Sequence, residues 1–357
     1  MKQTNKLLMM VLTITSMSIL GCKKDETSPS LTPGAYDAGV FITNEGQFGN
    51  GTGSVSFYNR TSGVVTNMVF ETANDGATLG NIVQSMEIYN SKGYIMVNNA
   101  NKVVVVNGSD FKFVTSITAT LPRYFLGIDN GKAYVSEWGT GGVNGAIKVI
   151  NLANNTVSSS IGTGKGAEKM VKSGNYVYVS CQGGFGKDSV VSVINTATDA
   201  VVSTISVGAS PSGIEIDANG KRWVLCGGEW NSSYTSLNKT GKLVRIDPST
   251  NKIDRTFDFT STTSKPSNLT INAAKNKLYY NYQGRVYSQD ITATALSNTI
   301  LINKSFYGMG VDPTNDYIYG ADAGNFASPG YVFRYNNTGA KIDSMKVGIA
   351  PGAFSFR

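Results

Sequence analysis

A pattern that recurs seven times along the chain constrains the fold more than any other feature. In each copy, a turn with Gly or Asn precedes a short run of aromatic and β-branched residues. The copies lie at residues 38–44, 92–98, 131–137, 174–181, 220–226, 276–282 and 316–322. A second such run follows each copy, at residues 53–58, 102–106, 146–150, 190–194, 242–246, 284–287 and 330–335. A repeat of roughly 40 to 55 residues is typical of propellers and other repeat architectures.

Each repeat predicts four antiparallel strands. A polar turn follows the second run. A third, more polar run comes next, for example residues 201–207, and a fourth run, for example residues 213–217, leads into the next repeat. The two central runs are apolar on both faces, for example in residues 103–106. In a sheet with one solvent-exposed face, apolar and polar residues would alternate along each strand. No stretch after residue 22 shows the 3.6-residue apolar period of a helix. We therefore predict an all-β, seven-bladed β-propeller rather than a sandwich.

The two ends of the repeat region predict how the ring closes. The first repeat begins directly at its second strand, residues 38–44, and lacks a strand before it. The chain finishes with one strand, residues 352–357, that has no repeat after it. If this last strand pairs with the first blade, the ring closes without a free sheet edge.

The chain contains no histidine, which excludes several catalytic classes. A Ser-His-Asp or Cys-His triad, a zinc site of the HExxH type and haem attachment at CxxCH all need that residue. Cys181 and Cys226 occupy matching places in two successive repeats. They are either two small buried residues or a disulfide, and they are too few for a multi-cysteine metal site. We expect a protein that is not an enzyme and that holds no metal or prosthetic group.

The N-terminal residues predict an address outside the cell. Lys2 and Lys6 precede an apolar stretch at residues 7–20, which is too short to cross a bilayer but suits a secretory signal. Leu20, Gly21 and Cys22 resemble the bacterial lipobox, which implies cleavage before Cys22 and a lipid anchor on its thiol; the alternative is an ordinary signal peptide with an unrelated cysteine.

Three segments follow from this interpretation. They are a lipoprotein signal peptide at 1–21, a lipidated Cys22 with a tether at 22–37, and the propeller at 38–357. Residues 23–26, Lys-Lys-Asp-Glu, resemble the surface-export tag of Bacteroidetes lipoproteins, although a solvated tether would read the same way. We expect an outer-membrane lipoprotein exposed at the cell surface. Its scattered charges form no basic stripe, so no nucleic-acid partner is expected.

Large aromatic residues recur in loops that should share one end of the ring. Five of the seven turns after the first runs carry one, and the connections between blades add further aromatic and basic residues. These candidates for ligand binding are Phe48, Arg123, Tyr124, Trp138, Phe185, Trp230, Tyr307 and Phe326. The polar candidates in the same loops are Glu45, Glu137, Gln182 and Asn231. The rings form either a shallow floor for a broad, flat, amphipathic ligand or plugs between neighbouring blades.

Several segments resemble a known family, at residues 41–51, 84–106, 121–125, 168–181 and 307–357. They are similar to the BtuG-type surface lipoproteins of Bacteroidetes and to the wider YncE-like, YVTN-type propeller group. The resemblance implies a seven-bladed propeller that captures cobalamin (vitamin B12) as a transported ligand and passes it to a BtuB-type, TonB-dependent outer-membrane transporter. The long loops 137–145 and 227–241 are not matched residue by residue.

Three functions remain open at this point. The first is a surface protein that captures a corrinoid. The second is an interaction module that holds a glycan or a protein partner in a surface layer or in adhesion. The third is a propeller enzyme such as a lyase or a quinone-dependent dehydrogenase.

Overall fold

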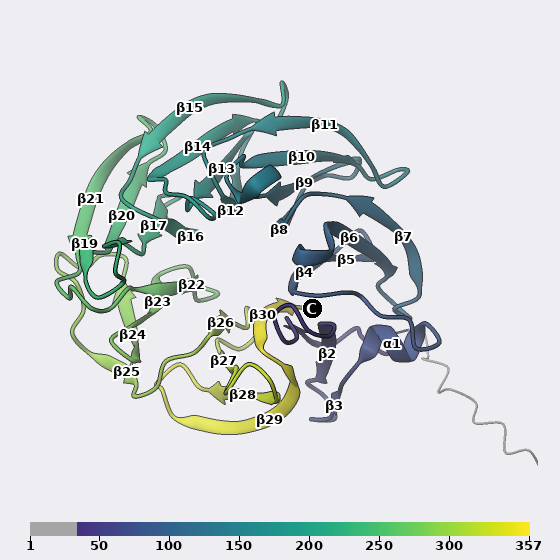
Figure 1. The fold of residues 1–357 in the computed structure, drawn as a ribbon. Coiled ribbons are helices and arrows are strands. Elements are labelled where there is room, and N and C mark those ends of the chain that lie inside the picture. The colour runs from purple at the N-terminus through teal and green to yellow at the C-terminus, as the bar shows by residue number, and fades with distance from the viewer. Residues whose placement is uncertain (1–33) are drawn as a thin grey trace, which may run out of the picture. The chain divides into compact units, whose positions relative to one another are not determined.

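The computed structural model describes residues 34–357, and these form seven four-stranded antiparallel sheets arranged in a ring (Figure 1). The first three blades, from the innermost strand outward, are β30 (Pro351–Phe356), β1 (Gly39–Asn44), β2 (Ser54–Asn59) and β3 (Val65–Thr66); β4 (Val83–Tyr89), β5 (Lys92–Val97), β6 (Lys102–Asn107) and β7 (Phe113–Thr118); β8 (Pro122–Asp129), β9 (Lys132–Glu137), β10 (Ala146–Asn151) and β11 (Thr156–Gly162).

The remaining four blades follow the same order, and the seventh ends next to the first. They are β12 (Ala167–Ser173), β13 (Tyr176–Cys181), β14 (Val190–Asn195) and β15 (Ala200–Ser206); β16 (Pro211–Ile216), β17 (Arg222–Cys226), β20 (Lys242–Asp247) and β21 (Lys252–Asp258); β22 (Ser267–Ile271), β23 (Lys277–Tyr282), β24 (Arg285–Asp290) and β25 (Ile300–Ile302); β26 (Gly308–Val311), β27 (Ile318–Asp322), β28 (Pro329–Tyr335) and β29 (Lys341–Ile349).

The ring closes as the sequence predicts. The innermost strands contact one another in the order β4, β8, β12, β16, β22, β26 and β30, and β30 returns to β4. The C-terminal strand β30 pairs antiparallel with β1, so that Phe41 lies opposite Ser355 (Figure 1). The predicted seven-bladed, all-β fold is therefore confirmed, and the first blade is built from both ends of the described chain.

A repeated hydrogen bond fastens three neighbouring pairs of blades. A tyrosine from the second strand of one blade donates its hydroxyl to a turn residue of the next. Tyr94 donates to Asn155 Oδ1 at 3.2 Å, and Tyr178 donates to Asn251 Oδ1 at 2.7 Å. Tyr134 donates to Asp199 in the same way. The three acceptors have φ of 55°, 52° and 49°, a left-handed conformation that Asn and Asp tolerate better than most residues.

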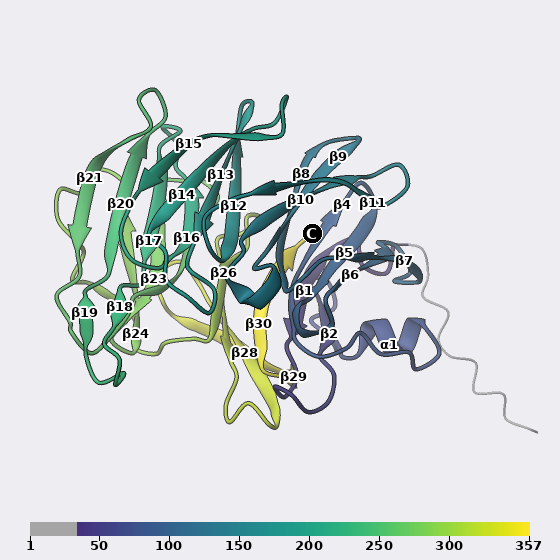
Figure 2. The same cartoon turned by 45° about the horizontal axis from the view of Figure 1, so that its top comes forward.

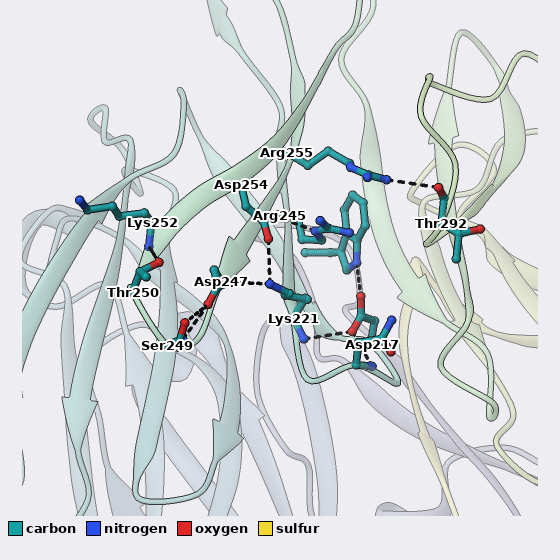
Figure 3. A network of polar contacts seen from close by, with 12 residues as sticks. Asp217, Lys221, Arg245, Asp247, Ser249, Thr250, Lys252, Asp254, Arg255 and Thr292 are labelled. Atoms are coloured by element: carbon teal, nitrogen blue, oxygen red, sulfur yellow. Dashed lines mark hydrogen bonds and ion pairs between the residues drawn. The ribbon is translucent and has the colours of Figure 1, made fainter.

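Charged residues hold the end of the fifth blade that carries the β16–β17 and β20–β21 turns (Figure 3). Asp217 accepts hydrogen bonds from the backbone amides of its own turn and from Trp223 Nε1 at 2.9 Å. Lys221 pairs with Asp247, and also with Asp254 at 2.9 Å. Since these groups satisfy one another, this end of the blade presents a self-contained polar network.

The structure differs from the prediction in three local details. The long loop of the fifth blade contains a two-stranded hairpin, β18 (Glu229–Trp230) and β19 (Leu237–Lys239). A short helix, α1 (Val69–Ala73), follows β3, and two single turns of 3-10 helix occur at η1 (Asn98–Ala100) and η2 (Thr140–Gly142). The tether was expected to reach residue 37, but Tyr36 is buried against Phe41 and Phe57, so the packed region begins earlier.

Two further observations concern the ends and the cysteines. Cys181 and Cys226 are buried and free, which matches the interpretation of small buried residues. Within residues 34–357, no helix is long and apolar enough to span a bilayer. The predicted signal peptide, Cys22 and most of the tether lie outside the described residues.

Candidate functional site

We call the end of the ring that carries the turns between second and third strands, together with the connections between blades, the loop face. Antiparallel order within each blade brings these turns to the same end. The hairpin β18–β19 projects from this end of the fifth blade (Figure 2). Loops at the ends of a rigid scaffold are common positions for binding residues.

Contacts between successive loops show that the predicted aromatic residues of neighbouring blades share the loop face. The Trp138 ring meets the Phe185 ring edge-on, with centroids 5.3 Å apart. Lys187, two residues further on, pairs with Glu229 at 2.7 Å, next to Trp230. Trp138 and Trp230 therefore lie at the same end of the ring.

Glycine allows the close approach of two of these loops. Gly142 has φ of 69°, and its carbonyl accepts a hydrogen bond from the Phe185 backbone amide at 2.9 Å. A Cβ atom at Gly142 would lie 2.2 Å from the Phe185 ring. The sequence around η2 is thus what lets Trp138 and Phe185 come together.

Most of the predicted loop aromatics are exposed rather than packed as plugs. Phe48 is 79% exposed and Phe185 is 73% exposed. Tyr234, in the β18–β19 turn, is 77% exposed and was not among the predicted residues. Phe326 and Tyr307 are exposed to a lesser degree and meet edge-on at 5.0 Å. Trp138 and Trp230 are half-buried.

Glu168 is a buried residue that the sequence analysis did not identify, and its carboxylate accepts hydrogen bonds from three of the predicted side chains. Glu168 Oε1 accepts hydrogen bonds from Arg123 Nε at 2.9 Å and from Trp138 Nε1 at 2.9 Å. Gln182 Nε2 donates to the same oxygen at 2.5 Å. The Arg123 guanidinium also lies 4.2 Å from the centre of the Trp138 ring. Glu168 sits at the start of β12 within a segment of the family resemblance, but nothing in its spacing marked it as inward-facing.

This Glu168 cluster is charged, buried and pre-arranged. Burial raises the pKa of the Glu168 carboxyl, and the neighbouring Arg123 opposes that effect. Burial also raises the pKa of Tyr124, the residue after Arg123. The Arg123 guanidinium lies beside the Trp138 ring, so the cluster places a cationic group next to a flat aromatic surface.

A second polar contact joins the first and last blades at the loop face. Tyr307 donates its hydroxyl to Glu45 Oε2 at 2.9 Å. Burial raises the pKa of Glu45, while this hydrogen bond acts in the opposite direction. Below these residues, a narrow channel cavity of about 190 Å³ is lined by Tyr124, Lys169 and Glu87, among others.

The hairpin of the fifth blade borders a separate cavity of about 340 Å³. Trp230, Tyr234 and Lys265 line it, and the Lys265 amine lies 5.8 Å from the centre of the Trp230 ring. Burial lowers the pKa of Lys265. Hydrogen bonds from Lys187 and Lys239 hold the pKa of Glu229 far below its usual value. This Trp230 cavity therefore combines two aromatic rings with several charged groups.

Two of the predicted polar residues are hydrogen-bonded or ion-paired to other groups of the protein. Glu137, a candidate binding residue or solvated loop acid in the sequence, is buried; Lys148 lies 3.2 Å from it, and the Thr120 backbone amide donates to it at 2.7 Å. Asn231 hydrogen-bonds Thr235 and Ser236 within its own hairpin. Asn231 thus satisfies groups of its own turn, whereas Glu137 bonds the connection between β7 and β8 and the neighbouring strand β10. Within residues 34–357, no three acidic or cysteine side chains are grouped to hold a metal ion.

Known structures match the described fold at low sequence identity. The periplasmic gluconolactonase PpgL of Pseudomonas aeruginosa aligns over 89% of this chain and 98% of its own, with a TM-score of 0.66 and 12% identity. A quinonprotein alcohol dehydrogenase-like protein of Bacteroides thetaiotaomicron aligns over 90% of this chain and 78% of its own, with a TM-score of 0.63 and 12% identity. Apo AztD from Citrobacter koseri aligns over 88% and 82%, with a TM-score of 0.53 and 13% identity.

These likenesses show the propeller fold alone. No curated protein matches the chain. One family model, described as a domain of unknown function (DUF5074), matches residues 38–349, which is most of the chain. The protein therefore belongs to the DUF5074 family, and its described part is a seven-bladed β-propeller.

Proposed function

We propose that this protein captures a broad, flat, amphipathic ligand on the loop face, that the ligand is a corrinoid such as cobalamin, and that it is passed to a BtuB-type, TonB-dependent outer-membrane transporter. The observation that carries the proposal is the set of exposed rings around a buried charged cluster on one face. Phe48 and Phe185 stand exposed there, and Glu168 holds Arg123 beside Trp138.

The chemistry of this face suits a corrinoid. The macrocycle has wide apolar surfaces that aromatic rings can contact, and its edge carries carboxamide groups that need hydrogen-bond partners. Gln182, Arg123 and the backbone of the loops supply such partners. The proposal also draws on the resemblance to BtuG-type lipoproteins. The lipobox-like Cys22 would anchor the protein at the cell surface. In this role the protein binds its ligand and has no enzymatic activity.

Titration of the purified protein with cyanocobalamin tests the proposal. We expect saturable binding in the micromolar range or tighter. Because the chain has no histidine, no protein imidazole can replace the lower base of the cobalt, so the cobalt absorption bands should keep their positions on binding. Phe185→Ala should weaken binding at least tenfold. Phe113→Ala is the matched control, since Phe113 is an exposed aromatic residue on the outermost strand β7. Absence of saturable binding, or equal loss in both variants, would reject the proposal.

The Trp230 cavity favours a second candidate function, the binding of a glycan on the cell surface. Trp230 and Tyr234 offer flat rings, and Glu229 and Asn238 lie in the same cavity with polar groups that can bond hydroxyls. A glycan array probed with the wild-type protein and with Trp230→Ala distinguishes the two candidates. Glycan binding that Trp230→Ala abolishes, without any response to cyanocobalamin, would favour the second candidate.

A further inference from the structure

A pocket between the first and last blades contains a buried carboxyl group that the proposed site does not use. This pocket, which we call the Glu71 pocket, has a volume of about 340 Å³. Its apolar wall is formed by Met68, Pro329, Val347 and Ile349, and its polar groups include Glu71 and Lys346. It opens at the loop-face end of the ring, because it is lined by the start of β28 and the end of β29.

Irregular structure in the first blade creates the space. The outer strand β3 has only two residues, whereas β29 on the neighbouring blade has nine. The chain leaves β3 through Met68, which has a left-handed φ of 55° and is more than half exposed. The helix α1 then carries Glu71 into the pocket wall.

One oxygen of the Glu71 carboxyl lacks a protein partner. Glu71 is 6% exposed, and its Oε2 makes no hydrogen bond to any of residues 34–357. Asn44, which contacts the pocket residues Ser54 and Gly348, also has a buried Oδ1 without a partner in this part of the chain. Most buried polar groups in folded proteins are hydrogen-bonded, so an unpaired acceptor in the wall of a cavity indicates a ligand that donates.

The surroundings of Glu71 select the kind of donor. Burial raises the pKa of its carboxyl, which weakens the attraction for a cation. Lys346 at the pocket would also repel an ammonium group, and a carboxylate has no N–H or O–H group to donate to the unpaired Glu71 oxygen. A primary carboxamide is neutral, its two N–H groups can donate to Glu71, and its carbonyl can accept from Lys346. We propose that the Glu71 pocket binds a small molecule, or one arm of a larger one, that carries a primary carboxamide on a short apolar stem.

The inference stands apart from the proposed function, because its test uses a simple amide in place of a corrinoid. Saturation-transfer NMR compares isobutyramide, isobutyrate and isobutylamine, which share one apolar stem. We expect saturable binding of isobutyramide, at least tenfold tighter than that of the acid or the amine. Equal binding of all three, or no saturable binding of the amide, would overturn the proposal.

Two variants locate the binding and separate it from a structural role. Glu71→Met replaces the unpaired carboxyl with an apolar group, so we expect it to raise Tm and to weaken amide binding at least tenfold. Thr52→Trp fills the pocket from an exposed position and should also block the amide, whereas Thr61→Trp, in the exposed turn between β2 and β3, should not. A lower Tm in Glu71→Met with unchanged amide binding, or equal binding in Thr52→Trp and Thr61→Trp, would reject the assignment.

Discussion

One arginine of the first blade reinforces the closure of the ring, and Arg60→Ala tests how much it contributes. Arg60 Nε lies 2.7 Å from Asp312 Oδ2, and its Nη2 donates to Oδ1 at 3.2 Å. Arg60 Nη1 also donates to the backbone carbonyl of Arg357, the residue after β30. The arginine of the first blade thus binds the seventh blade and the C-terminal residue together.

The structure sets the size of the expected loss. The Asp312 side chain is fully buried, and removal of one partner from a buried ion pair costs about 3–5 kcal/mol. Asp312 Oδ1 keeps hydrogen bonds from the Thr314 backbone amide at 2.9 Å and from the Thr314 hydroxyl at 2.7 Å. We therefore expect a loss near the lower end, about 3 kcal/mol, in the free energy of unfolding.

Urea unfolding and hydrogen exchange measure different parts of this effect. Arg60→Ala should lower the unfolding midpoint and should speed exchange in β30 more than in β12, on the far side of the ring. Arg285→Ala is the control, because Arg285 bonds an exposed Asn303 at 3.1 Å and should cost less than about 1 kcal/mol. A loss below about 0.5 kcal/mol for Arg60→Ala, or uniform acceleration of exchange, would refute the reasoning.

Three further predictions follow from other parts of the ring. Burial raises the pKa of Glu87 and of Glu215 to about 7 from 4.5, so the folded state holds protons that the unfolded state releases. The free energy of unfolding should therefore fall as pH rises from 4.5 to 7, by on the order of 3 kcal/mol per carboxyl. Thermal unfolding at pH 5 and pH 8 measures this, and the difference in Tm between the two pH values should be smaller in Glu87→Gln. The same difference in Tm in the variant and the wild type would contradict the prediction. Tyr178→Phe removes a bond to the next blade and should cost about 1 kcal/mol in urea unfolding, and a loss below about 0.3 kcal/mol would count against the bond. Trp138→Ala and Trp230→Ala should weaken ligand binding while the far-UV spectrum stays unchanged; unchanged binding in both would remove them from the site.

The blade architecture was predictable because it depends on a local pattern of apolar residues. Each blade needs two central strands that are apolar on both faces, and this requirement is repeated seven times. The closing strand was predictable because the first repeat lacked one strand and the last repeat was followed by one extra strand. The hairpin β18–β19 was not, because strands of two and three residues leave no periodic signal in a loop of Ser, Asn and Thr.

The candidate site was predictable only in part, and the reason is physical. Alternation tells which face of a strand is apolar, but it does not tell whether a polar residue at a strand end meets solvent, a backbone amide or an ion partner. Glu137 and Glu168 look alike in sequence, yet Glu137 is engaged by Lys148 and a turn amide, while Glu168 collects Arg123, Trp138 and Gln182. Glu168 is bonded by Arg123 and Trp138 of the preceding blade, and such contacts between blades cannot be inferred from spacing within one repeat.

The stability of the ring does not require the exposed aromatics of the loop face. Three of the contacts between blades are made by Tyr94, Tyr134 and Tyr178 in the second strands. The ring is closed by the pairing of β30 with β1, and Arg60 adds an ion pair to the seventh blade. Rings that are more than two-thirds exposed bury little apolar area, so they add little to folding and favour association instead. Replacing Phe48 or Phe185 by Ser should accordingly leave Tm within about 1 °C and reduce self-association. A clear drop in Tm would mean that these rings fill the gaps between blades. The exposed rings would then no longer support ligand binding at the loop face.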